Sequence, residues 1–182
     1  SDRVLRKMKR GHSAKTYREI VKAFRSQIPE ITIATDVIVG FPSETEDDFQ
    51  KTLELIKDTQ PDIVNSSKFS ARPNTAAANL KQLRSDIIKK RTDKLHLLVK
   101  DISRMRNSMW VGWRGKVIVD ELNSNNIIGR NYAYKSIILS PRIRSQSDSQ
   151  QQARYTIGTE IEADIYGYSD YSLEGQPVKH YS

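Results

Sequence analysis

Residues 35–49 read Thr35-Asp36-Val37-Ile38-Val39-Gly40-Phe41-Pro42-Ser43-Glu44-Thr45-Glu46-Asp47-Asp48-Phe49. This segment predicts a buried strand, a tight turn and the acidic first turn of a helix. The β-branched run before Gly40 is typical of a strand that is covered on both faces. Gly40 has no Cβ, so a backbone or a ligand can approach closely there. Thr45 is a good N-cap residue, and the acidic residues after it favour the positive end of a helix dipole.

The turn after this strand is a candidate wall of a ligand site, because ligands of open α/β sheets and barrels bind at the carboxyl ends of strands. The alternative is an ordinary connection between a strand and a helix. Asp36 places a carboxylate in an apolar strand, where it needs a partner or a ligand. Arg72, at the expected end of the next strand, could clamp a carboxylate or phosphate, or could pair with Asp36 or a nearby glutamate.

The pattern along the chain predicts an α/β protein. Apolar spacing and caps indicate helices and strands in alternation, which is typical of parallel βαβ units. After a long helix over residues 84–109, period-two alternation predicts about five short strands in a small all-β barrel of the OB-like kind. The remaining elements are expected as helices over residues 2–10, 13–27 and 45–59 and as strands over residues 31–39 and 62–69.

The sequence therefore divides into three parts. Residues 1–79 form the α/β part, residues 80–110 form a basic linking helix, and residues 111–180 form the β-barrel. The low-complexity run over residues 145–152 is expected to be a loop.

The charge distribution favours a polyanionic partner. The net charge is +8, and residues 80–116 carry eleven Lys or Arg against three Asp, so this segment alone matches the charge of the whole chain. Residues 1–25 are also basic, whereas residues 36–62 are acidic. Two basic segments around an acidic one suggest nucleic acid, although a solvated helix face would carry the same charges.

Several classes of protein are excluded by composition. The 182 residues include no cysteine, which excludes disulfides, thiolate metal sites and cysteine nucleophiles. The three histidines share no metal-ligand spacing. No run approaches the ~20 apolar residues of a membrane span, and neither a hydrolase motif nor a P-loop is present. We expect a cytoplasmic protein with no membrane partner.

Cations and aromatic rings gather on one expected strand of the small barrel. Strands of this type can stack unpaired bases on aromatic rings and hold phosphates with Arg and Lys. The alternative is that one tyrosine belongs to the core and the cations are solvated. The residues concerned are Arg130, Asn131, Tyr132, Tyr134 and Lys135.

Taken together, these segments resemble the carboxyl-terminal part of a radical S-adenosylmethionine methylthiotransferase of the MiaB/RimO family. Residues 1–12 resemble the segment after the family's fourth barrel strand, with Met8 and Arg10 at characteristic positions. Residues 35–49 are similar to its Thr-Asp-(apolar)-Ile-Val-Gly-Phe-Pro-Gly-Glu-Thr-Glu block, with Ser43 in place of glycine. The resemblance implies that residues 1–79 are the carboxyl-terminal part of a partial (β/α) barrel.

Two further motifs extend the resemblance over nearly the whole chain. Residues 69–75 resemble the family's Arg-Pro-Gly-Thr block, with Asn74 in place of glycine, and Asn tolerates left-handed backbone angles. Residues 111–180 resemble a TRAM domain, an RNA-binding module, and Gly129-Arg130-Asn131-Tyr132 fits its signature. The RNA-binding residues that follow from the sequence and the resemblance are Arg72, Lys116, Arg130, Asn131, Tyr132 and Lys135.

The segment Asn65-Ser66-Ser67-Lys68-Phe69 and the segment Lys81-Gln82-Leu83 resemble the archaeal–eukaryotic type of the family. That type adds a methylthio group to C2 of N6-threonylcarbamoyladenosine beside the anticodon of tRNA. The implied partners are a tRNA anticodon stem-loop and a reductant protein. Alternatives are an enzyme that acts on isopentenyladenosine in tRNA, a stand-alone RNA-binding module without catalysis and, fitting less well, an enzyme that modifies a ribosomal protein.

The resemblance implies S-adenosylmethionine and two 4Fe-4S clusters as cofactors. Because the cluster ligands are cysteines and this chain has none, the amino-terminal domain and the first half of the barrel are expected to be absent. The chain is then expected to be inactive alone, and no catalytic residue is assigned. The implied cofactor-binding residues are Ser1 at the ribose, Arg10 and Asp36 at polar groups, and Val37, Ile38 and Phe69 beside the adenine.

Overall fold

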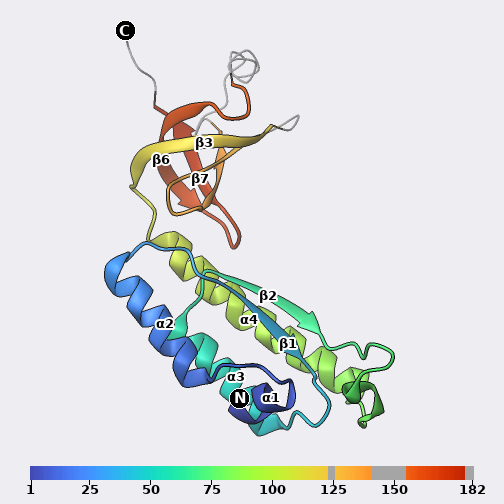
Figure 1. Cartoon of the computed structure of the whole chain (residues 1–182). Coiled ribbons are helices and arrows are strands. Elements are labelled where there is room, and N and C mark those ends of the chain that lie inside the picture. Colours follow the sequence, from blue (N-terminus) through green and yellow to red (C-terminus); the bar gives the residue numbers. More distant parts are fainter. Residues whose placement is uncertain (123–125, 141–154, 179–182) are drawn as a thin grey trace. The chain divides into compact units, whose positions relative to one another are not determined.

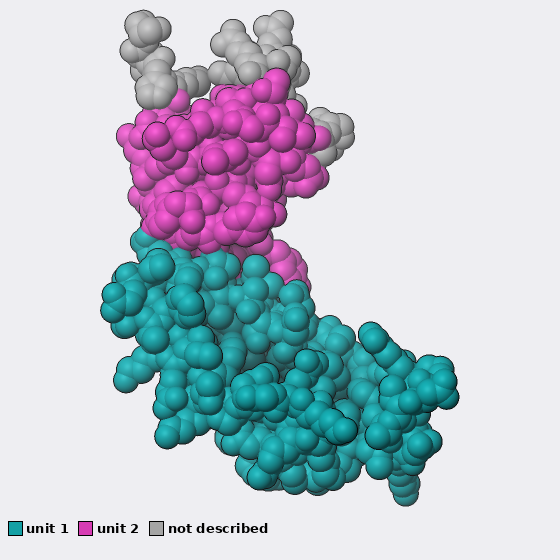
Figure 2. Space-filling view, in the orientation of Figure 1, with its two compact units in different colours: residues 1–102 teal, residues 103–182 magenta. Residues whose placement is uncertain are grey.

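Figure 1 shows the computed structural model of the chain, which describes residues 1–122, 126–140 and 155–178. Two units follow one another along the chain, residues 1–102 and residues 103–182 (Figure 2). Their boundary falls inside the long helix α4 (Ser85–Ser108), whereas the sequence set residues 80–110 apart as a separate part. The low-complexity run over residues 145–152 lies outside the described residues.

Helices and strands alternate through unit 1, as the sequence predicts. β1 and β2 pair in parallel, with Asp36 directly opposite Asn65. The order is α1 (Asp2–Lys7), α2 (Ala14–Gln27), β1 (Ala34–Val39), α3 (Glu46–Thr59), β2 (Ile63–Lys68), the 3-10 helix η1 (Ala76–Asn79) and the first part of α4.

Local capping signals set the starts of α2 and α3. The side chain of Ser13 accepts a hydrogen bond from the backbone N–H of Thr16 at 3.1 Å. At the start of α3, Thr45 Oγ1 accepts from the N–H of Asp48 at 3.2 Å, and Asp48 Oδ2 accepts from the N–H of Thr45 at 2.9 Å. This reciprocal pair is a complete capping box, which confirms the predicted N-cap.

One face of the small sheet is covered and the other is bare. The covered face joins β1 and β2 to α3 and α4 in one core, whereas Ala34 and Asp36, on the opposite face of β1, are exposed. The expectation that this strand is covered on both faces is therefore wrong for the described chain. Leu95 is fully buried in this core, so α4 does more than link the two units. The core residues are Val37, Val39, Phe49, Leu53, Ile56, Val64, Leu95, Leu98, Val99 and Ile102.

Gly40 lies where the end of β1 meets α4. Its φ is +86°, and a Cβ at this position would lie 2.6 Å from Cγ1 of Ile88. The group that approaches Gly40 closely is thus a side chain of α4, whereas the sequence led us to expect a backbone or a ligand there.

The carboxylate of Asp48 ties α1 to α3. It accepts hydrogen bonds from Ser1 Oγ at 2.6 Å and from Arg3 Nε at 3.1 Å, and it forms an ion pair with the Arg3 guanidinium. Arg3 also donates to the carbonyl of Ser43 at 2.6 Å, which holds that residue at a φ of +72°. The hydrogen bonds from Arg3, Ser1 and Thr45 hold the pKa of Asp48 far below its ordinary value.

A closed barrel of five strands forms unit 2, which confirms the predicted small β-barrel. The strands are ordered β3-β4-β5-β7-β6, and β3 closes the barrel by antiparallel pairing with β6. Residues 131–135 form a turn between β4 and β5 rather than part of one strand, because the ladder stops at Arg130 and resumes at Ser136. The strands are β3 (Arg114–Leu122), β4 (Ile127–Arg130), β5 (Ser136–Leu139), β6 (Glu160–Tyr168) and β7 (Leu173–Pro177).

Replacement of Gly40 by alanine is expected to destabilise unit 1. The positive φ costs about 1 kcal/mol for a residue with a Cβ, and the contact with Ile88 adds about 1–3 kcal/mol of overpacking. Urea unfolding followed by far-UV circular dichroism measures the loss. Gly158→Ala is the matched control, because Gly158 has a φ of +88° but no atom within 4 Å of the added Cβ. Equal losses of unfolding free energy in the two variants would show that the contact with Ile88 adds nothing to the cost.

Acid is expected to weaken unit 1 through Asp48. Because its pKa is lower in the folded than in the unfolded chain, its stabilising contribution is present above the unfolded pKa of about 3.9 and is lost as the pH falls below it. The free energy of unfolding should therefore fall below about pH 4, and Asp48→Asn should flatten that fall and cost about 2 kcal/mol at neutral pH. The control is Asp47→Asn at an exposed position of the same helical turn. Parallel pH profiles for the two variants would show that Asp48 does not carry the effect.

Candidate functional site

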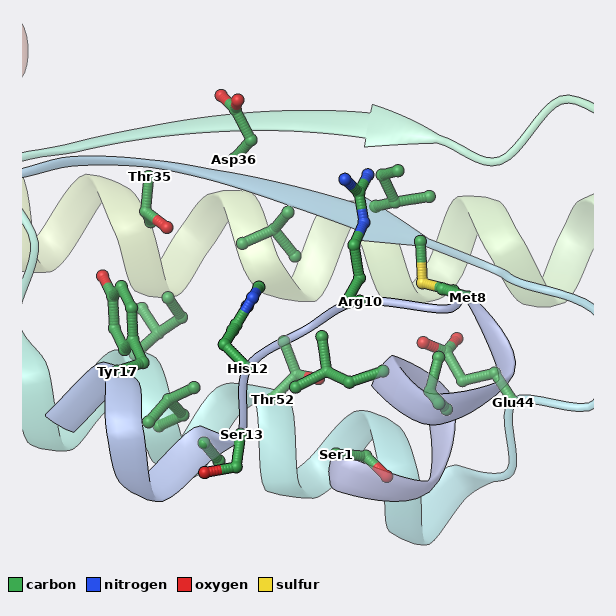
Figure 3. Close-up of a pocket in the computed structure, with 17 residues that line it drawn as sticks. Ser1, Met8, Arg10, His12, Ser13, Tyr17, Thr35, Asp36, Glu44 and Thr52 are labelled. Carbon is green, nitrogen blue, oxygen red and sulfur yellow. The ribbon is translucent and has the colours of Figure 1, made fainter.

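A pocket of about 430 Å³ opens in unit 1 between α1, the loop after it, α2, β1 and α3 (Figure 3). Its volume is in the range of small-molecule sites. The wall is largely apolar, with polar groups from the loop, β1 and the turn after β1. The apolar lining is Val4, Leu5, Met8, Ala14, Tyr17, Val37, Ile38, Leu55 and Ile56, and the polar lining is Ser1, Arg10, His12, Ser13, Thr35, Asp36, Glu44 and Thr52.

Five of the six predicted cofactor-binding residues line this pocket, namely Ser1, Arg10, Asp36, Val37 and Ile38. They come from the first residue, from the loop after α1 and from β1. Phe69 does not line it, because its ring packs edge-on against Phe41, with the ring centroids 5.1 Å apart.

Arg10 brings a cation to the pocket. It lies in the loop between α1 and α2, where its backbone N–H donates to the carbonyl of Leu5 at 2.9 Å. Figure 3 shows its guanidinium reaching toward β1. Its side chain has no hydrogen bond or ion pair with another described residue. A guanidinium in this position can bind a carboxylate or a phosphate of a ligand.

Asp36 lies at the rim of the pocket on the bare face of the sheet. Its carboxylate and the Thr35 side chain point to opposite sides of β1 (Figure 3). Asn65 Nδ2 donates to Asp36 Oδ1 at 3.0 Å across the parallel pair. Asn65 was not predicted as a site residue, because its position opposite Asp36 depends on the register of the two strands. The carboxylate keeps capacity to accept hydrogen bonds from hydroxyl or ammonium groups.

Glu44 is a pocket residue that the sequence did not single out. It accepts a hydrogen bond from the N–H of Gly40 at 3.1 Å and another from Arg91 at 2.7 Å. Burial raises the pKa of Glu44, and these two hydrogen bonds offset only part of that effect.

Arg91 of α4 holds the turn after β1 in place. One of its N–H groups bonds both the carboxylate and, at 3.2 Å, the carbonyl of Glu44, and its guanidinium pairs with Glu46 at 3.2 Å. The guanidinium also lies 5.5 Å from the ring centroid of Phe49. Arg91 was counted among the basic residues that favour a polyanionic partner, but it is buried and engaged within the chain. The turn therefore contributes Glu44 to the pocket, and its other contacts include α4 through Gly40, α1 through Ser43 and Phe69 through Phe41.

Four predicted RNA-binding residues are exposed or partly exposed. Arg72 follows β2, is exposed and has no acidic partner among the described residues. Lys116 of β3 pairs with Glu160 at 2.8 Å, and Arg130 at the end of β4 pairs with Asp120 at 2.5 Å. Tyr132 is exposed on one side and lies against Trp110 and Trp113 on the other, with ring centroids at 6.0 and 6.2 Å.

The structure corrects the assignment of Asn131 and Lys135 to the RNA-binding surface. Asn131 is 5% exposed and Lys135 is 7% exposed. Asn131 Oδ1 accepts hydrogen bonds from the N–H groups of Ala133 and Lys135, both at 3.1 Å. Lys135 Nζ donates to Asn107 Oδ1 of α4, also at 3.1 Å. These two side chains shape the turn between β4 and β5 from inside and are not available to a surface ligand.

Within residues 1–122, 126–140 and 155–178, no helix combines the length and the apolar character needed to cross a membrane. The same residues contain no cluster of three or more His, Asp or Glu side chains that could hold a metal ion.

Comparison of the sequence with known proteins identifies the family to which the pocket segment is similar. Residues 1–56, which contribute every residue that lines the pocket, match the model of the Radical SAM superfamily. The chain is 43% identical over 141 residues to a "Probable threonylcarbamoyladenosine tRNA methylthiotransferase" of Archaeoglobus fulgidus, a match that covers 75% of this chain and 32% of the relative. A protein of the same name from Pyrococcus horikoshii is 44% identical over 137 residues, with the same coverage of 75% and 32%.

A third relative has a different substrate in its name. The "tRNA-2-methylthio-N(6)-dimethylallyladenosine synthase" of Pelotomaculum thermopropionicum is 36% identical over 144 residues, which covers 77% of this chain and 32% of that protein. The chain thus spans about a third of the length of the curated relatives it matches. Because the similarity extends over three quarters of the chain and includes the segment that forms the pocket, the chain belongs to the radical S-adenosylmethionine tRNA methylthiotransferases and corresponds to part of such a protein.

Proposed function

We propose that the complete protein is a tRNA methylthiotransferase that adds a methylthio group to C2 of N6-threonylcarbamoyladenosine next to the anticodon. The observation that carries this proposal is the pocket of unit 1, which gathers Ser1, Arg10, Asp36, Val37 and Ile38 within the segment that matches the superfamily. The relatives named for this modification support the substrate. In this proposal the chain supplies part of the cofactor pocket and the surface that holds the tRNA.

The chemistry of the pocket fits S-adenosylmethionine. The Arg10 guanidinium would bind the carboxylate of its methionine part, because it carries a cation with no partner among the described residues. The Asp36 carboxylate would accept hydrogen bonds from the ammonium or ribose hydroxyls, while Asn65 holds it in one orientation. Val37 and Ile38 would border the adenine. When bound and reductively cleaved, this cofactor supplies a deoxyadenosyl radical.

The iron–sulfur clusters implied by the family do not fit the residues of this chain. Clusters of this kind are held by cysteine thiolates, and the chain has no cysteine. We propose that the remaining part of the protein binds both clusters and receives electrons from a reductant protein. The chain would accordingly have no activity alone.

The described residues also position the pocket. Arg91 and Gly40 hold Glu44 at the wall, and Asp48 holds Ser1 there through the hydrogen bond of 2.6 Å. Apolar residues of α1 and α3 line the pocket and give it a largely apolar wall.

Contacts with the tRNA anticodon stem-loop are proposed for Arg72 of unit 1 and, separately, for Lys116, Arg130 and Tyr132 of unit 2. Arg and Lys bind phosphates, and an exposed ring stacks on an unpaired base. Lys116 and Arg130 already pair with Glu160 and Asp120. A phosphate must share or displace these carboxylates, so we expect each cation to contribute less than a free one.

Two other functions remain as candidates. The Pelotomaculum relative favours isopentenyladenosine in tRNA as the substrate. The cysteine-free chain and its barrel favour an RNA-binding module without catalysis.

An activity assay with the complete protein distinguishes these candidates. The protein is incubated without oxygen with S-adenosylmethionine, a reductant and tRNA that carries either modified adenosine, and the nucleosides are analysed by mass spectrometry. We expect the 2-methylthio product only from the threonylcarbamoyl nucleoside, because the relatives that share 43% and 44% identity with this chain carry that name. Product from isopentenyladenosine alone would favour an enzyme that acts on that nucleoside. No product from either tRNA would favour the RNA-binding module without catalysis.

The cofactor role of Arg10 and Asp36 is testable by binding. Arg10→Ala and Asp36→Asn in the complete protein should each raise the dissociation constant of S-adenosylmethionine about tenfold or more, because each removes a hydrogen bond that involves a charge. Equilibrium dialysis with radiolabelled cofactor measures the change. Lys22→Ala is the control, since Lys22 is exposed on α2 and does not line the pocket. Unchanged affinity in both pocket variants would place the cofactor elsewhere.

A further inference from the structure

The turn between β4 and β5 holds a strained aromatic residue. Tyr134 has a φ of +63°, in the left-handed region, where a bulky side chain is an outlier. The residue is 67% exposed, so burial offsets little of the strain. Strained residues of this kind persist only where the surrounding structure holds them, and they cluster at ligand-binding sites.

Buried polar groups hold this turn from within. Asn131 Oδ1 binds the N–H groups of Ala133 and Lys135, and the carbonyl of Asn131 accepts from the N–H of Tyr134 at 2.9 Å. Lys135 Nζ bonds Asn107 in the last turn of α4, where a cation also interacts favourably with the helix dipole. The backbone of Tyr134 is therefore fixed on both sides of the residue.

Arg130 covers one face of the Tyr134 ring. Its guanidinium carbon lies 4.5 Å from the ring centroid. Asp120 accepts from Arg130 Nε at 2.5 Å, and the carbonyl of Tyr134 accepts from another N–H of the guanidinium at 3.4 Å. One face of the ring thus carries the cation, and the residue as a whole is 67% exposed, which leaves room for a ligand on the other face.

The neighbouring exposed ring is supported differently. Tyr132 projects from the same turn, but it leans on Trp110 and Trp113 rather than on a cation. The turn thus presents two tyrosines, of which only Tyr134 combines an adjacent guanidinium with backbone strain.

We propose that Tyr134, backed by Arg130, is a stacking site for an unpaired base of single-stranded RNA. A base would stack on the open face of the ring, and the remaining N–H groups of Arg130 would bind the phosphate of the same strand. In this proposal, the strained backbone at Tyr134 has a function, because it directs the ring to the surface instead of into the barrel. This inference rests on the proposed function, in which the ligand is a tRNA loop.

The inference is tested with Tyr134→Gly in the whole chain. Glycine adopts the positive φ without strain, so the thermal midpoint of unit 2, followed by tryptophan fluorescence, should stay the same or rise. Affinity for a single-stranded oligoribonucleotide, measured by fluorescence anisotropy, should fall about five-fold to a hundred-fold, because stacking on one ring is lost. Tyr134→Phe keeps the ring and should bind within about twofold of the parent.

Two controls separate stacking from general effects. Tyr171→Ala removes the ring of a residue that is 82% exposed in the loop between β6 and β7, and it should leave the affinity unchanged. Duplex RNA of the same length has no unpaired base, so its affinity should be the same for Tyr134→Gly and the parent. Parent-like affinity of Tyr134→Gly for single-stranded RNA would overturn the inference, as would a clear fall of its thermal midpoint, which would make the ring structural.

The failure of this inference is distinguishable from that of the proposed function. If the complete protein modifies tRNA while Tyr134→Gly leaves RNA affinity unchanged, only the stacking site is overturned. If the complete protein modifies no tRNA but Tyr134→Gly still weakens binding of single-stranded RNA, the stacking site stands and the enzyme assignment falls.

Discussion

The buried ion pair between Arg91 and Glu44 is the interaction on which the pocket depends. Their atoms approach to 2.7 Å, and the two side chains are 8% and 4% exposed. The pair joins α4 to the turn that follows β1, and the N–H of Gly40 binds the same carboxylate. Loss of one partner of a buried pair costs about 3–5 kcal/mol, because the other charge stays buried. The position of Glu44 and the entry into α3 follow from this contact.

Unit 2 uses buried polar groups in a similar way. Asn131 and Lys135 lie inside and hold a turn, while Tyr132 and Tyr134 project from that turn to the surface. In both units a polar network fixes the backbone of a turn. In unit 1 the networked residue Glu44 itself lines the pocket, whereas in unit 2 other residues of the turn, Tyr132 and Tyr134, are exposed. Residues that make hydrogen bonds inside the protein and residues that are available to a ligand are thus close neighbours in sequence, although their roles differ.

Much of the fold was predictable because its signals are local. Thr45 is the N-cap of α3, as the sequence predicts, and the structure adds Asp48 as its partner in a capping box; Ser13 caps α2. The five short strands of the barrel follow from their alternation. Errors arose where a contact joins distant residues. Phe69 packs on Phe41 outside the pocket, and Lys135 is buried and bonded to Asn107. A sequence motif alone could not show that neither side chain is available to a ligand.

The amino-acid order alone indicated the family and most of the helices and strands, because caps, periodicity and motifs lie within short segments. It did not give all their boundaries, since residues 131–135 form a turn where the sequence predicts part of a strand. It also indicated the residues from α1 and β1 that the structure brings to one pocket. Tertiary structure decided which of the many Lys and Arg side chains are paired within the protein and which are available to a ligand. Arg91 binds Glu44 across 47 positions, whereas Arg10 keeps an unpaired guanidinium among the described residues. The physical reason is that burial and pairing depend on neighbours in space, and the distance along the chain does not reveal them.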